Sequence, residues 1–484
     1  MSLTSKTTIG VFWNFIEQVS RRGVQVFVTL LLAYFLSVED FGLVAMIAVF
    51  LALANSLMDS GFQAALIRLK APSQIDFSTA FYANIILGCV AYVLLYVSAP
   101  FIALFYNEPK ILELIRVVGI VVIINSFQVV QVSKLSRDMK FSTLLKVNLP
   151  AAFLSGVLAV LLAYLGYGVW ALIVQMVISS TLVVLFLWWQ KIWRPCCSFS
   201  KKSLLNMYGF GYKLFLSGVI DIVFKNLYII VIGKLFSIAV VGLYYFADRI
   251  KEMIVMQLVT AIQNVTYPAL ATKQNDEIQL KAAYKKLVCV MTFILFPFII
   301  FFVVFCDLLF DLFLPEKWNE AVIYLQLMLM SSVLMPLHSV NLNILKVMGR
   351  TDLFLWLEVI KKTLLALILF VTIDYGVVAV LYGQIILSIL GYFINSYYSS
   401  RLIQYSIFEQ VSDFFPSLLI SCLIAGFAYS LQLYIEWLPV VELIIFGGTS
   451  ILLYVIFSHY MRVHAYILTK KLLIDQLNNK GISL

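Results

Sequence analysis

The chain has 484 residues, of which 63% are hydrophobic and only 12% are charged, and its mean hydropathy is +0.99. Soluble proteins are roughly 45–50% apolar and about 25% charged, so this composition excludes a soluble domain carrying a single anchor. The net charge of +9 would suit a nucleic-acid binder, but basic residues of a membrane protein concentrate in its cytoplasmic loops.

A membrane helix needs about 20 mostly apolar residues, and fourteen segments meet this requirement. They are expected at 10–36, 41–67, 77–105, 111–133, 143–165, 168–190, 208–235, 240–270, 284–314, 321–346, 353–373, 376–400, 413–434 and 440–462. The first run is too long for a cleavable signal and lacks small-residue cleavage chemistry. We therefore predict an all-α integral membrane protein with about 14 transmembrane helices.

The loops between these segments differ in charge. With the N-terminus inside, the cytoplasmic loops are strongly basic, as in Lys134, Arg137 and Lys140, whereas the opposite loops are mainly acidic, as in Glu39 and Asp40. The positive-inside rule then places both termini in the cytoplasm. This arrangement accounts for the net charge without a nucleic-acid partner.

Catalytic and metal-binding patterns are missing from the sequence. The six cysteines and three histidines show no metal-ligand spacing, and there is no Walker A motif, zinc signature or nucleophile elbow. We expect no catalytic residues, no metal site and no bound cofactor, and hence not an enzyme.

The chain also repeats itself at offsets of 200 to 213 residues. "FLSVEDFGL" (35–43) resembles "LFSIAVVGL" (235–243), and "YGVWAL" (167–172) resembles "YGVVAV" (375–380). Each half holds six expected helices, so both halves enter the membrane in the same orientation, as in transporters built from parallel repeats. We predict an N-lobe at 1–200, a C-lobe at 201–410, and two appended helices with a cytoplasmic tail at 411–484.

Three expected helices carry polar stripes inside the membrane, where charge is costly unless it faces protein or water. The stripe of the first helix is Asn14, Glu17, Gln18, Arg21 and Gln25, with Arg22 at its edge. The seventh helix carries Asp221 and Lys225, and the eighth carries Asp248, Arg249, Lys251 and Glu252. The simplest geometry is a wet central cavity between the two lobes.

These charges have two readings. Asp221–Lys225 and the Asp248–Glu252 cluster could be structural ion pairs whose charges neutralise each other. For any one pair, this interpretation is as good as a functional role. The number of bases favours function, because Arg21, Arg22, Lys225 and Arg249 exceed the acids near them. A cationic cavity suits an anionic cargo, since the arginine fork matches phosphate oxygens.

Three stretches carry a resemblance to a known family: residues 31–67, the "RDMKFSTLL" and "YLGYGVWALIVQMVIS" region, and "WRP" at 193–195. They resemble polysaccharide flippases of the multidrug/oligosaccharidyl-lipid/polysaccharide exporter superfamily, nearest to O-antigen, colanic-acid and teichuronic-acid exporters. The resemblance implies a bacterial inner-membrane protein. Its implied cargo is an undecaprenyl-pyrophosphate-linked oligosaccharide, flipped to the outer leaflet for surface polysaccharide synthesis.

The resemblance also implies that arginines of the first and eighth helices hold the pyrophosphate, which here are Arg21 or Arg22, and Arg249. Lys225 is added from its own stripe, with Asn14, Gln18 and Gln25 as polar lining. Glu17, Asp221, Asp248 and Glu252 are candidates for coupling to a proton or sodium gradient. A polysaccharide polymerase and a chain-length regulator are the implied partners, beside membrane lipids and the lipid-linked substrate.

Three other functions compete with this one, of which a structural scaffold would not need cationic stripes inside the membrane. An ion-coupled drug or metabolite antiporter of the same superfamily would favour an acidic cavity. A membrane glycosyltransferase or polymerase would show large loops with catalytic carboxylates, whereas the loops here are short.

Overall fold

The computed structural model describes residues 3–435 and 437–479, and every regular element within these residues is a helix. Contacts group the chain into two compact units, residues 1–245 and 246–484. The predicted lobes are defined by the sequence repeat and not by compactness, so their boundaries at 200 and 410 stay predictions.

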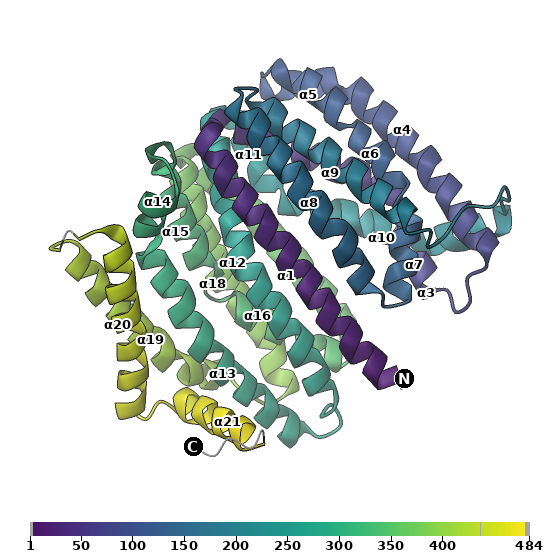
Figure 1. Ribbon diagram of the computed structural model, residues 1–484. Coiled ribbons are helices and arrows are strands. Elements are labelled where there is room, and N and C mark those ends of the chain that lie inside the picture. Colours follow the sequence, from purple (N-terminus) through teal and green to yellow (C-terminus); the bar gives the residue numbers. More distant parts are fainter. Residues whose placement is uncertain (1–2, 436, 480–484) are drawn as a thin grey trace. The chain divides into compact units, whose positions relative to one another are not determined.

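The first unit contains eleven helices and the start of a twelfth within the described residues. They are α1 (Leu3–Phe35), α2 (Val38–Asp59), α3 (Phe62–Arg68), α4 (Gln74–Tyr106), α5 (Lys110–Val118), α6 (Ile120–Ser126), α7 (Val129–Arg137), α8 (Phe141–Tyr164), α9 (Val169–Trp189), α10 (Lys201–Lys225), α11 (Leu227–Leu235) and α12 (Ile238–Ala271). The long helix α1 runs alongside α8 (Figure 1).

The second unit continues α12 and adds the remaining helices. They are α13 (Glu277–Val304), α14 (Cys306–Phe313), the 3-10 turn η1 (Glu316–Trp318), α15 (Glu320–Ser332), α16 (Met335–Val347), α17 (Thr351–Thr372), η2 (Ile373–Tyr375), α18 (Val377–Leu402), α19 (Ile407–Gln432), α20 (Pro439–Tyr460) and α21 (His464–Asn479). Helix α21 was not predicted, and it turns across the end of α20 (Figure 1).

Several predicted segments are broken helices. The segment expected at 41–67 is divided between α2 and α3, because Ser60 and Gly61 adopt positive φ angles of 42° and 77°. A Cβ on Gly61 would lie 2.7 Å from the backbone of Gly211 in α10. The backbone of α10 thus occupies the space that a side chain at this break would need.

The number of membrane crossings stays a prediction. Within the described residues, ten helices are long and apolar enough to cross a membrane, or eleven with the bent segment 110–137. The three other predicted segments are α1, α12 and α17, and each carries several charged residues. The charged residues of α1, α12 and α17 therefore account for the difference between eleven and fourteen.

The predicted repeat recurs in the backbone. Ser37 caps α2 by accepting a hydrogen bond from the Asp40 amide at 3.2 Å, and Ser237 accepts one from the Val240 amide at 3.4 Å before α12. Gly168 and Gly376, which precede α9 and α18, both have positive φ angles. Such conformations favour glycine because it has no Cβ.

The repeated glycines Gly42 and Gly242 lie at a close crossing of α2 and α12. A Cβ on Gly42 would lie 2.2 Å from the Ile238 carbonyl oxygen, and one on Gly242 would lie 2.0 Å from the Val38 carbonyl oxygen. Val38 lies four residues before Gly42, and Ile238 lies four residues before Gly242. Each glycine thus contacts the residue four positions before the other glycine, so the contact is reciprocal. We call these four residues the glycine crossing.

Candidate functional site

The polar stripe of α1 is organised around Glu17, which is only 6% exposed. Its Oε1 accepts hydrogen bonds from Arg21 Nε at 3.1 Å and from Asn148 Nδ2 of α8 at 2.8 Å. Gln18 donates to Asn14 Oδ1 at 3.2 Å. A buried carboxylate needs such partners, because an unpaired buried charge is costly.

The basic side chains of α1 are less buried than Glu17. The side chain of Arg21 is 37% exposed, Arg22 is half-buried, and Gln25 is exposed. The helix therefore holds its acid inside the unit and leaves a guanidinium accessible at the surface of the unit.

On α10, Asp221 and Lys225 form an ion pair of 2.8 Å, and their side chains are 49% and 73% exposed. This pair of residues is four positions apart, so both lie on one face of the helix. In a helix that spans the bilayer, charges this exposed require water, a polar ligand or protein against them.

On α12, the second unit presents another exposed pair. Arg249 Nη1 lies 3.4 Å from Glu252 Oε2, and both side chains are about half exposed. Lys251 pairs with Asp248 in a more buried position. The structure thus joins each of these bases to an acid three residues away in the same helix.

The basic excess of these stripes is small. The five bases are Arg21, Arg22, Lys225, Arg249 and Lys251, and the four acids are Glu17, Asp221, Asp248 and Glu252. The net charge of this set is +1. Arg21, Lys225 and Arg249 each have an acidic partner, so the argument from excess charge is weaker than the sequence indicated.

A polar group inside the second unit was missed in the sequence. His338 Nδ1 lies 3.0 Å from Asn395 Nδ2, and Lys361 pairs with Glu358 at 2.5 Å. Both His338 and Lys361 pack against Gly391, where a Cβ would lie 3.3 and 3.9 Å from their side chains. The charged residues Glu358 and Lys361 of α17 could have revealed this polar group in the sequence, because they lie in a predicted membrane span.

An apolar groove lies in the second unit where α13, α14 and α20 meet. Its volume is about 470 Å³, and its walls include Phe293, Phe298 and Phe301 of α13, Leu309 of α14 and Ile451 of α20. We call this the apolar groove. Its lining suits a hydrocarbon ligand, since such cavities bind by burying apolar surface.

Comparisons with known proteins place the chain in a family. A model of the family described as "Polysaccharide biosynthesis protein" matches residues 31–323. The chain is 25% identical to the teichuronic acid biosynthesis protein TuaB of Bacillus subtilis, over 86% of each chain. It is 26% identical to the lipopolysaccharide biosynthesis protein WzxC of Escherichia coli, over 81% of this chain and 82% of that one.

Two solved structures share the fold. The lipid II flippase MurJ, in an inward closed conformation, matches with a TM-score of 0.73 and 14% identity, over 94% of this chain and 98% of that one. An inward-facing multidrug resistance MATE family transporter matches with a TM-score of 0.57 and 16% identity, over 81% and 96%.

These comparisons confirm the predicted all-α transporter fold and the expectation that the chain is not an enzyme. The family model covers more than half of the sequence. The chain is therefore a multi-pass membrane protein that belongs to the polysaccharide biosynthesis protein family.

Proposed function

We propose that the chain is a flippase for an undecaprenyl-pyrophosphate-linked oligosaccharide repeat unit, which it moves from the cytoplasmic to the outer leaflet by alternating access. Its relatives are named for the biosynthesis of teichuronic acid, lipopolysaccharide and, for the transport protein ExoT of Rhizobium meliloti, succinoglycan. The shared fold with a lipid II flippase supports the same class of cargo.

The observation that carries this proposal is the exposure of basic side chains in helices of a membrane protein. Arg21, Lys225 and Arg249 are 37%, 73% and 50% exposed although each has an acidic partner. Exposed ion pairs are weak, typically about 0–1 kcal/mol. A pyrophosphate can therefore displace the acid beside Arg21 or beside Arg249 and take bidentate hydrogen bonds from that arginine.

The polyprenyl tail of this cargo would lie in the apolar groove. The groove is lined almost wholly by aromatic and aliphatic side chains, and a polyprenyl chain offers the matching surface. The appended helices would then serve the lipid part of the cargo, whereas the stripes of α1, α10 and α12 serve its charged part.

Coupling to a proton or sodium gradient would use the acidic residues that form ion pairs with the basic residues of the stripes. Glu17 shares its Oε1 between Arg21 and Asn148, so a proton or sodium ion on this carboxylate would release Arg21 for the pyrophosphate. Asp221, Asp248 and Glu252 stand in the same relation to Lys225, Lys251 and Arg249.

The test replaces Arg21 or Arg249 by Ala and measures surface polysaccharide at matched protein level. Losing a hydrogen bond to a charged group costs about 1.5–3 kcal/mol, so each variant should export about 10 to 150 times less repeat unit under limiting expression. Lys202→Ala, at an exposed position in the first turn of α10, is the matched control. Normal polymer from both arginine variants would remove these residues from the site.

The alternative is an ion-coupled drug or metabolite antiporter of the same superfamily. The near balance of bases and acids in the stripes, and the fold shared with a MATE transporter, are the observations in its favour. Dye efflux from cells or vesicles separates the two functions. A deletion strain that accumulates a lipid-linked oligosaccharide on the cytoplasmic face would support the flippase.

A further inference from the structure

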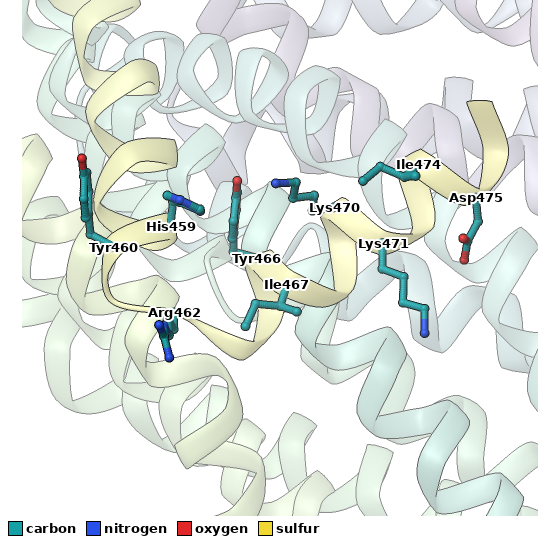
Figure 2. Close-up of a pocket in the computed structure, with 9 residues that line it drawn as sticks. All are labelled: His459, Tyr460, Arg462, Tyr466, Ile467, Lys470, Lys471, Ile474 and Asp475. Carbon is teal, nitrogen blue, oxygen red and sulfur yellow. The ribbon is translucent and has the colours of Figure 1, made fainter. Parts of the chain in front are cut away.

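The junction of α20 and α21 forms a basic pocket in the second unit, apart from the stripes and the apolar groove. Its volume is about 610 Å³, and Figure 2 shows the residues that line it: His459, Tyr460, Arg462, Tyr466, Ile467, Lys470, Lys471, Ile474 and Asp475. We call it the α20–α21 pocket.

The backbone builds this pocket by ending α20 abruptly. Arg462 adopts a φ angle of 48°, and the amides of Arg462 and Val463 bond the carbonyls of His459 and Ser458 at 3.1 and 3.0 Å. This closes the last turn of α20 and sends α21 off in a new direction. The small residues Ala465 and Thr469 are buried, which fixes the inner face of α21.

Aromatic rings hold the wall of the pocket in place. The rings of His459 and Tyr466 meet edge to face at 5.5 Å, and Tyr466 packs on Phe293 of α13 at 5.9 Å. Lys470 extends toward the Tyr466 ring (Figure 2). The Lys470 ammonium group therefore lies beside Tyr466, whose ring is held in place by its contact with α13.

The pocket has a net positive charge in the described part of the chain. Arg462, Lys470 and Lys471 line it with a single carboxylate, Asp475, and none of these three bases forms an ion pair within residues 3–435 and 437–479. An anion is the ligand that such a set of donors favours.

The surroundings indicate that this anion belongs to a lipid. The pocket opens where a predicted membrane-spanning helix ends, and Tyr460 beside it is 81% exposed. Ile467 and Ile474 of α21 are also exposed. Exposed apolar and aromatic residues interleaved with lysines are typical of a helix that lies in the membrane interface, whereas a soluble phosphate would need no apolar rim.

We propose that the α20–α21 pocket binds the phosphate of an anionic phospholipid headgroup at the membrane surface where α20 ends. Lys470 lies beside Tyr466, whereas Lys471 points to the other side of α21 (Figure 2). The three bases therefore attract the phosphate by their joint positive charge at the membrane surface, while Tyr460, Ile467 and Ile474 contact the acyl chains near the glycerol. This site is independent of the proposed cargo, and it fixes α21 against the bilayer.

The test measures retention of lipid by the full chain, purified in detergent, by native mass spectrometry with added phosphatidylglycerol. Each basic residue near a membrane surface contributes about fivefold to the binding of anionic lipid, so Lys470→Gln with Lys471→Gln should bind about 30-fold more weakly. The control is Lys201→Gln with Lys202→Gln, a second adjacent and exposed lysine pair, which should bind as the wild type does.

Two further ligands distinguish an anionic lipid from a zwitterionic lipid and from free phosphate as the ligand of this site. Phosphatidylcholine and inorganic phosphate should each compete poorly with phosphatidylglycerol for this site. Equal retention by the lysine variant and the control, equal binding of phosphatidylcholine, or full competition by inorganic phosphate would each overturn the proposal. If the double variant does not elute as a folded monodisperse protein, Arg462→Gln, with an expected loss of about fivefold, replaces it. Because no transport is measured, the outcome does not bear on the flippase proposal.

Discussion

At the scale of residues, the stripes contain two kinds of ion pair that the sequence could not distinguish. Glu17 is buried and shared between α1 and α8, whereas Asp221 and Lys225 form an exposed pair within α10. Both show the same four-residue spacing, and spacing says nothing about burial. The partner Asn148 lies 131 positions away, so only the fold reveals it.

This difference predicts unequal effects on stability. Glu17→Ala leaves Arg21 and Asn148 without their shared acceptor, so it should destabilise the protein. A broken buried pair costs about 3–5 kcal/mol, and because Arg21 is partly exposed we expect about 1–2 kcal/mol after screening. Asp221→Ala should cost at most about 1 kcal/mol. Thermal unfolding of the two purified variants in one detergent measures this, and equal midpoints would refute the assigned role of Glu17.

At the scale of elements, helix positions were predictable and helix breaks were not. The long apolar runs give the positions directly, since each predicted span coincides with a helix or an adjoining set of helices. The break at Gly61 depends on the approach of Gly211, a contact between distant segments that composition does not encode. Helix α21 was missed because its lysines and its short length hide its apolar positions from a search for spans.

The glycine crossing gives a prediction for these elements. Gly242→Ala places a Cβ 2.0 Å from the Val38 carbonyl oxygen, so α2 and α12 must separate, at an expected cost of about 3 kcal/mol. Gly209→Ala in α10 is the matched control, since nothing lies within 4 Å of its added Cβ. It should be neutral or stabilise by about 0.5–1 kcal/mol. The yield of folded protein after detergent extraction distinguishes the variants, and unaffected Gly242→Ala protein would mean that the crossing is not tightly packed.

At the scale of the whole molecule, composition and loop charge predicted the class of protein, and the family comparison agrees with that prediction. The candidate site was predictable only as separate stripes. Which residues of different helices act together depends on distances between elements, and a single sequence carries little information about those distances. The pocket at α20–α21 likewise depends on a turn at Arg462 that no motif marks.

The loop charges also predict the orientation of the chain. A green fluorescent protein fused after Leu484 should fluoresce in cells, and alkaline phosphatase fused at the same point should be inactive, because the basic loops keep both termini in the cytoplasm. Fusions after Glu108, in a predicted outer loop, should give the reverse pattern. An active phosphatase at the C-terminus would contradict the predicted cytoplasmic position of this end.

The reciprocity of the glycine crossing has an evolutionary consequence. Val38 touches Gly242 and Ile238 touches Gly42, which is the pattern that two identical subunits make across a two-fold axis. A half-length ancestor could have dimerised through this patch, and gene duplication followed by fusion would have kept the contact unchanged. Any later drift at one glycine would then have been constrained by its counterpart two hundred residues away.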